Sequence, residues 1–199
     1  EDKKILELFD KAHKGVYLDI GCYHPTRVNN TLSLYRKGWR GMNIDLNQLT
    51  IDMFNYARPG DINICAAISN KEIKKKLYYL GDLDPKNTLD LKHKSWLKTT
   101  FNISNKDIKT RYIKTLRLEK ILDKHNFKEI DFMNIDIEGH EIEVLKSINF
   151  RKTKVNVICV EVLDYDKRKK KQLLNFFKKN NYFLKKRISI NYIFQKKLN

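Results

Sequence analysis

The sequence predicts an α/β fold, an open and mostly parallel sheet with helices on both faces. Apolar runs typical of strands alternate with amphipathic segments typical of helices through most of the chain. Residues 155–162 form a continuous apolar run, as expected for a central parallel strand buried on both faces. Two final strand-like runs, 182–188 and 191–196, suit an antiparallel hairpin. The 199 residues, 41% of them apolar, suit a single domain with a sizeable core.

The amino-terminal half is predicted to alternate helices with strands. Asn30 and Thr31 can begin the second helix, which Gly38 ends, and Asn47 or Thr50 can cap the third. The predicted elements are a helix over 3–13, a strand over 16–20, a helix from residue 32 to the glycine, a strand over 42–46, a helix ending before residue 59, and a strand over 62–66.

The carboxyl-terminal half begins with a segment that lacks clear periodicity. Residues 81–107 hold several turn-forming pairs, which indicates an irregular excursion. Such excursions are typically lids or binding loops, so we expect 81–107 to be a substrate-facing insertion in one domain spanning 1–199. The other predicted elements are an extended segment over 75–80, a strand over 113–116, a helix over 118–125, a strand from 130 into a turn at 136–140, a helix over 142–148, the 155–162 strand, a Lys-rich helix, and the terminal hairpin.

Two strand ends have the features of a site for a nucleotide-like cofactor. The first predicted strand breaks at Asp19-Ile20-Gly21 and the second ends at Asp45, which fits one βαβ unit of about thirty residues. A glycine there lets the backbone approach a ligand, and an acid after the second strand can accept from ribose hydroxyls. Only Gly21 stands where a dinucleotide fingerprint needs three glycines. A cofactor without a pyrophosphate is therefore favoured, and S-adenosylmethionine is the common one.

The formal net charge of +17 raises the question of an anionic partner. The chain is also rich in Lys, Asn and Ile together, a composition typical of A/T-rich codons, and Lys greatly outnumbers Arg. On this interpretation basic runs such as 74–76 and 167–171 are solvated faces. Nucleic-acid binders usually interleave Arg and exposed aromatic residues, and that pattern is sparse here. A nucleic-acid partner stays open but is not favoured.

The cysteines and the hydropathy pattern bear on location. Cys22, Cys65 and Cys159 are widely spaced, without a C-x-x-C pattern, and are typical of reduced thiols in a cytosolic protein. No apolar run approaches the ~20 residues that span a membrane, and the amino terminus lacks a signal-peptide apolar region. We therefore expect a cytoplasmic protein without a membrane span. Nothing in the sequence indicates an oligomeric state.

Five short segments together form a recognisable pattern: Tyr17-Leu18-Asp19-Ile20-Gly21, Asn30-Thr31, Gly38-Trp39-Arg40-Gly41-Met42-Asn43-Ile44-Asp45, Ala66-Ala67-Ile68-Ser69 and Ile135-Asp136-Ile137-Glu138-Gly139-His140-Glu141. The pattern resembles the FkbM family of S-adenosylmethionine-dependent methyltransferases over roughly residues 15–165. The resemblance implies a class I methyltransferase fold, a Rossmann-like three-layer sandwich. Its seven-stranded sheet would be mostly parallel, with one antiparallel strand near the carboxyl terminus.

Two features depart from the family pattern. Many members follow the first Asp-x-Gly with Ala-Asn-x-Gly, whereas this chain has Cys22-Tyr23-His24-Pro25 and lacks the second glycine. The contact to the methionine end of the cofactor must therefore be made differently, and the His-Pro variant resembles a branch of the same family. Residues 81–107 match no segment shared by the family, so the resemblance does not indicate which residues form the acceptor pocket.

The resemblance and the strand-end pattern together imply a set of cofactor contacts. Asp19 and Gly21 are expected at the methionine end and Asp45 at the ribose, while the helix start at 30–31 can seat the cofactor carboxylate. Some of these residues also have a purely structural interpretation. Asn47 can be a helix cap, His24 a turn residue, and Ala67 and Ile68, expected beside adenine, core residues. The predicted set is Asp19, Gly21, Cys22, Tyr23, His24, Asn30, Thr31, Asp45, Leu46, Asn47, Ala67 and Ile68.

Asp136, Glu138 and His140 follow the strand beginning at 130, where the resemblance places the transferred methyl, and form the predicted catalytic set. Methyl transfer needs in-line positioning and removal of the hydroxyl proton, for which Asp136 or His140 is the candidate base. Alternatively, Asp136 with Glu161 or Asp164 coordinates Mg²⁺ or Ca²⁺, which would bind two neighbouring sugar hydroxyls. Glu138 can also simply complement a helix dipole.

The leading functional hypothesis is O-methylation of a sugar, a glycan or another small polar metabolite with S-adenosylmethionine. The alternatives are a cap-type RNA methyltransferase that uses the basic surface, and a cofactor-binding module without catalysis. Within the excursion, His93, Trp96 and Phe101 can form either a sugar-stacking wall or a small satellite core.

Overall fold

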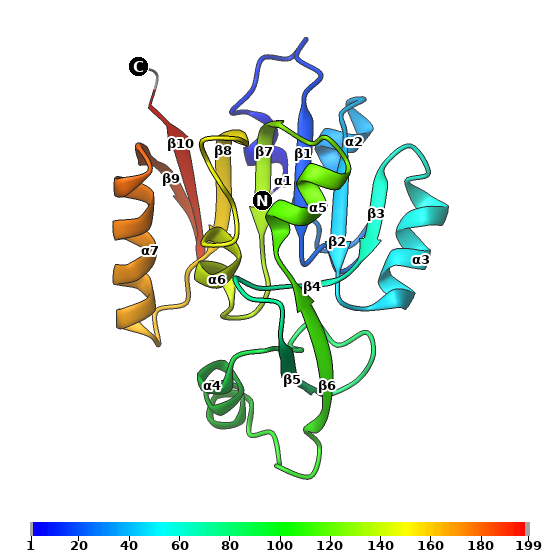
Figure 1. Ribbon diagram of the computed structural model, residues 1–199, viewed down its shortest axis with the longest axis vertical. Helices are drawn as coiled ribbons and strands as arrows, with labels where there is room; N and C mark the ends of the chain where they lie inside the picture. Colours follow the sequence, from blue (N-terminus) through cyan, green and yellow to red (C-terminus); the bar gives the residue numbers. More distant parts are fainter. Residues whose placement is uncertain (1, 198–199) are drawn as a thin grey trace.

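A computed structural model describes residues 2–197, and its centre is a seven-stranded sheet in the order β3-β2-β1-β7-β8-β10-β9 (Figure 1). The first five strands in this order are mutually parallel, β10 is antiparallel to β8, and β9 is antiparallel to β10. One strand near the carboxyl terminus is therefore reversed, as predicted. The strands are β1 (Val16–Ile20), β2 (Arg40–Asp45), β3 (Ile62–Cys65), β7 (Glu129–Ile135), β8 (Lys154–Glu161), β9 (Tyr182–Ile188) and β10 (Asn191–Lys196).

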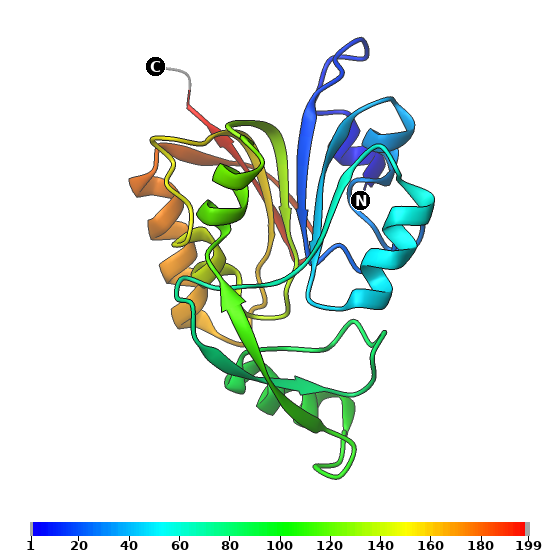
Figure 2. The ribbon, with the colours of Figure 1, turned by 45° about the vertical axis from the view of Figure 1, so that its right-hand side comes forward.

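Helices cover both faces of this sheet and make three layers (Figure 2). Successive residues of a strand point to opposite faces, so Leu18 packs in the larger core cluster and Tyr17 in the smaller one. The larger cluster lies under α5 (Leu118–Lys124), α6 (Glu141–Leu145) and α7 (Lys167–Lys179). The opposite face carries α1 (Asp2–Leu6), α2 (Leu32–Arg36) and α3 (Gln48–Ala57).

A second, three-stranded sheet lies beyond the carboxyl ends of the parallel strands (Figure 1). It consists of β4 (Ala67–Ile68), β6 (Lys109–Leu116) and β5 (Lys74–Tyr79), in that order, and α4 (Leu91–Phe101) accompanies it. Its inner side holds a small cluster that includes Ala67, Leu77 and Leu89. This unit therefore stands over the sheet edge at which the predicted site residues gather.

The structure differs from the sequence prediction in several places, of which the first helix and the excursion are the largest. The helix expected over 3–13 ends at Leu6, and Asp10 accepts a hydrogen bond from the Ala12 N–H, a local turn that competes with a helix. The excursion 81–107 is not irregular throughout, because it contains α4. Asp90 caps this helix by accepting from His93 N at 2.7 Å, and Asn102 ends it in a left-handed conformation.

The weak apolar pattern of α4 explains why the sequence did not predict it, since only His93 and Leu97 are buried. The strand expected over 113–116 is longer, at Lys109–Leu116, because its exposed outer half pairs with β5. In the part of the chain that the structure describes, no helix has the length and hydropathy needed to cross a bilayer.

The packing of α7 onto the sheet gives a test of the core. The Phe177 ring stacks on Phe194 with centroids 3.8 Å apart and is 1% exposed. Phe177→Ala should lower the free energy of unfolding by about 3–5 kcal/mol, through lost burial and a cavity. Phe101→Ala, where the side chain is 55% exposed, should change it by less than about 1 kcal/mol. Urea denaturation measures both; equal losses would contradict this packing.

Candidate active site

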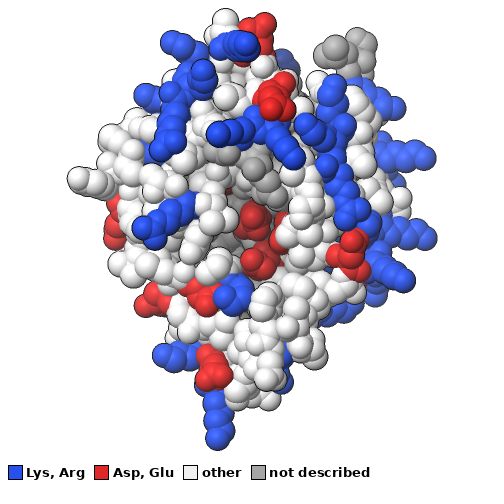
Figure 3. Space-filling view, turned by 180° about the vertical axis from the view of Figure 1, so that it is seen from behind, with Lys and Arg blue, Asp and Glu red and all other residues white. Residues whose placement is uncertain are grey.

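A cavity of about 350 Å³ lies at the carboxyl ends of β1, β2, β7 and β8. In the space-filling view from behind, acidic side chains form the floor of a hollow that Lys and Arg surround (Figure 3). Most of the predicted site residues line this cavity. The exceptions are His24, Thr31 and Asp164. Residues 82–85, which belong to the segment expected to face the substrate, also line the cavity, as does the turn at 189–191, which the sequence did not indicate.

Asp19 is fully buried and holds together three parts of the site. Its carboxylate accepts hydrogen bonds from Thr31 Oγ1 at 2.8 Å, Asn29 Nδ2 at 3.1 Å and Asn134 Nδ2 at 2.9 Å. Burial raises the pKa of Asp19, and the hydrogen bonds from Asn134 and Thr31 oppose this rise. The Asp19 carboxylate thus ties segment 22–31 to the ends of β1 and β7.

Arg58 supports the same segment from behind and was not predicted from the sequence. Its side chain is 1% exposed and donates to Thr31 Oγ1 at 2.9 Å, to Asn29 Oδ1 at 2.9 Å and to the Pro25 carbonyl at 2.6 Å. The guanidinium also lies 4.9 Å from the centre of the Phe54 ring. At the sequence level Arg58 is one of many basic residues and merely precedes a helix-stopping Pro-Gly, so no signal marked it.

The segment after β1 turns sharply without the family's second glycine. Gly21 has φ +76°, and a Cβ there would overlap the Asp136 carbonyl oxygen, so glycine lets the ends of β1 and β7 approach. Tyr23 adopts φ 54° and donates its N–H to Asp45 Oδ2 at 3.1 Å. His24 accepts from the Thr26 N–H at 3.1 Å outside the cavity, in agreement with its reading as a turn residue.

Asp45 lies at the end of β2, at the cavity wall. Its carboxylate accepts from Asn47 N at 2.9 Å as well as from Tyr23 N. Burial raises the pKa of Asp45 to about 6, against the effect of these backbone donors. Asn47 caps α3 by accepting from Leu49 N, and its amide donates to the Asp82 carbonyl. Asn47 therefore also links the start of α3 to the excursion.

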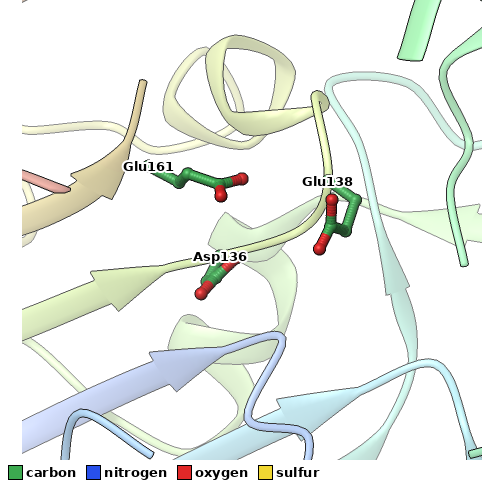
Figure 4. A group of neighbouring side chains, drawn as sticks. All are labelled: Asp136, Glu138 and Glu161. Atoms are coloured by element: carbon green, nitrogen blue, oxygen red, sulfur yellow. The ribbon is translucent and has the colours of Figure 1, made fainter. Parts of the chain in front are cut away.

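Three carboxylates converge at the floor of the cavity (Figure 4). Asp136 and Glu138 follow β7, Glu161 ends β8, and one oxygen of each lies within 4.8 Å of the others. We call these three residues the acid group. Glu138 has a left-handed backbone, and its carbonyl accepts from Thr88 Oγ1 at 2.7 Å. Asp164 lies elsewhere, exposed and paired with Lys170 and Arg187, so the structure does not bring it to this group.

His140 lines the cavity but is 3% exposed. Its Nε2 lies 3.1 Å from Ser69 Oγ and 3.1 Å from Lys75 Nζ. Burial, reinforced by the Lys75 ammonium, lowers the pKa of His140 to about 3. The imidazole is therefore neutral near pH 7 and a weak proton acceptor.

The aromatic residues of the excursion pack behind the cavity and do not line it. Trp96 stacks on Tyr165 with ring centroids 4.9 Å apart, and Phe101 packs edge-on against Trp96. His93 is fully buried beside Glu138. The satellite-core interpretation of these residues therefore fits the structure better than a sugar-stacking wall.

The fold and the cavity define a class of protein: a Rossmann-like α/β domain with a cofactor-sized cavity at its parallel strand ends and an acid after the second strand. Residues 12–184 match the family model of the methyltransferase FkbM domain, which is most of the chain. The chain belongs to this family and is an S-adenosylmethionine-dependent methyltransferase, which confirms the resemblance found in the sequence. No curated protein matches it.

Arg58→Met tests the support of segment 22–31. The substitution removes the cation behind Asp19 and leaves hydrogen-bond acceptors buried, so the free energy of unfolding should fall by about 3–5 kcal/mol. Arg58→Lys should recover only part of this loss, because a single ammonium nitrogen lacks the planar fork whose two NH2 groups reach Thr31, Asn29 and the Pro25 carbonyl together. The control is Arg36→Met at an exposed position, which should change the free energy of unfolding by no more than about 0.5 kcal/mol. Losses of similar size for Arg58→Met and Arg36→Met in urea denaturation would refute the role.

Proposed function

We propose that this methyltransferase acts on a hydroxyl of a sugar, a glycan or another small polar metabolite. The observation that carries the proposal is the acid group, which lies in the same cavity as Asp45 and the segment after β1. Carboxylates can accept hydrogen bonds from several neighbouring hydroxyls and can take the proton released on O-methylation. A module that only bound cofactor would have no use for three acids at this place.

The residues of the cavity suit S-adenosylmethionine by size and chemistry. Asp45 can accept from the ribose hydroxyls, and the apolar side chains of Leu46, Ala67 and Ile68 offer a surface for adenine. The polar segment 21–30 is available for the methionine end. When bound, the cofactor supplies a methyl group activated by a sulfonium.

The charge of the cavity argues against an RNA acceptor. Lys and Arg surround the hollow in Figure 3, which would favour a polyanion at the rim, but the floor is acidic. Phosphates next to the acid group would meet like charges at close range. A neutral polyhydroxylated acceptor avoids this repulsion, so the RNA reading remains the less favoured alternative.

We favour Asp136 over His140 as the general base. The His140 side chain is almost fully buried, and its Nε2 already lies within 3.1 Å of Ser69 Oγ and Lys75 Nζ, which weakens the case for His140. Asp136 lines the cavity just after the end of β7. A divalent cation is the second candidate role, because three converging carboxylates are hard oxygen ligands of the type that Mg²⁺ and Ca²⁺ prefer. In that case Glu138, rather than Asp164, would complete the ligand set.

Asp45 gives the cofactor affinity an expected pH dependence. Its ionised carboxylate is the form that accepts from two ribose hydroxyls, and its pKa is about 6. Affinity should therefore be full above pH 6 and fall below it, by at most about tenfold per pH unit. Asp45→Asn should remove this dependence and weaken binding about ten- to hundredfold. Calorimetry with S-adenosylhomocysteine measures both, with exposed Asp52→Asn as control; an unchanged pH profile in Asp45→Asn would contradict the role.

Asp136→Asn tests the proposed chemistry. It should lower turnover by at least about 100-fold and leave the dissociation constant of S-adenosylhomocysteine within about twofold. The assay is transfer of labelled methyl to a panel of sugars, polyols and RNA, with exposed Asp123→Asn as control. If EDTA abolishes wild-type turnover and Mg²⁺ restores it, the acid group holds a metal; insensitivity to EDTA supports the base. Unchanged turnover in Asp136→Asn excludes both roles, and methylation of RNA alone would reject the small polar acceptor.

A further inference from the structure

His93 contacts the acid group from a helix that the sequence did not predict. It lies in the first turn of α4, fully buried, and its backbone N–H donates to the capping Asp90. Asp90 also pairs with Lys169 Nζ at 2.7 Å, so α4 is fastened to α7. The backbone of His93 is therefore held in place beside the turn that follows β7.

The imidazole of His93 connects Tyr165 to Glu138. Nδ1 lies 3.0 Å from the Tyr165 hydroxyl, and Nε2 lies 2.8 Å from Glu138 Oε2, as a close polar pair rather than a linear hydrogen bond. Burial raises the pKa of Tyr165, so its hydroxyl stays protonated and can donate to Nδ1. Nδ1 is then the acceptor, and the Nε2–H faces the Glu138 carboxylate.

The turn after β7 is shaped to receive this imidazole. Gly139 has φ +93°, and a Cβ there would lie 3.0 Å from His93 Cβ and 3.2 Å from the Tyr165 hydroxyl. Glu138 itself has φ 56°, a conformation that non-glycine residues seldom adopt, and its carbonyl is held by Thr88 of the same excursion. Backbone and side chain of Glu138 are thus both fixed by residues 88–93.

We propose that His93, itself oriented by Tyr165, is a positioning residue that holds the Glu138 carboxylate toward the acceptor end of the cavity. Glu138 lines the cavity, while His93 and Tyr165 do not, so His93 acts only through Glu138. With Oε2 engaged by His93, the other oxygen of Glu138 is available to accept from an acceptor hydroxyl. The excursion then serves the acid group as well as forming a cavity wall. This inference rests on the proposed function, because it assigns Glu138 to the acceptor.

The first test concerns the contacts from Tyr165 through His93 to Glu138 and needs no acceptor. Nitrogen-15 NMR of histidine-labelled wild-type protein should show His93 as the Nε2–H tautomer, and Tyr165→Phe should remove this preference while keeping the Trp96 stack. A wild-type Nδ1–H tautomer would overturn the proposal, as would a His93 signal that Tyr165→Phe leaves unchanged. This measurement does not depend on cofactor or turnover. It therefore tests whether Tyr165 orients His93 even if the proposed function is wrong.

The positioning role is tested by kinetics on an acceptor that the wild-type protein methylates. His93→Leu should lower kcat about ten- to hundredfold, with the dissociation constant of S-adenosylhomocysteine within about twofold. His93→Gln, which keeps an N–H donor, should recover most of the loss, and Ser95→Ala on the exposed side of α4 should match wild type. Unchanged kcat in His93→Leu, or a parallel loss of kcat and cofactor affinity, would overturn the proposal. Absence of S-adenosylhomocysteine binding by the wild-type protein would instead reject the proposed function.

Discussion

The site depends on two buried charges, Asp19 and Arg58, and on the polar side chains between them. An unpaired carboxylate or guanidinium inside a protein costs several kcal/mol, so neither is tolerated without partners. Here Thr31 and Asn29 bond to both, and the whole of segment 22–31 is drawn into one conformation at the end of β1. This segment forms a wall of the cavity. The conformation of this cavity wall thus depends on the polar contacts of Asp19 and Arg58.

The second half of the cavity is built by the excursion, which is attached to the first half through polar contacts. Asn47 at the start of α3 donates to the Asp82 carbonyl, and Thr88 donates to the Glu138 carbonyl. The acid group therefore lies where the two halves meet. In parallel α/β sheets ligands generally bind at the carboxyl ends of the strands, whatever the family. In this protein the excursion supplies the cavity residues that face those strand ends. The acid group itself comes from the strand ends, while residues 82–93 form the facing wall of the cavity and hold Glu138 in place.

Much of the sheet, and of the cavity wall at the ends of β1 and β2, could be predicted from sequence, because their signals are local. Asp19-x-Gly21 and Asp45 each follow a short apolar run, and the family match rests on the same segments. Arg58 and Asn134 could not be found this way, since they contact residues far away in the chain and resemble any polar residue locally. The helix α4 was missed because its buried face consists of a histidine and a leucine, too little for a periodic pattern. Asp164 was chosen by proximity to β8, but the chain turns it toward Lys170 and Arg187.

We have proposed that one cavity at the strand ends joins a cofactor site at Asp45 to an acceptor site at the acid group. The most direct test is a crystal structure of the protein with S-adenosylhomocysteine. In that structure we expect the ribose hydroxyls on the Asp45 carboxylate, adenine against Ile68, and the sulfur directed toward Asp136. A ligand bound elsewhere, or one whose sulfur points away from the acid group, would contradict it.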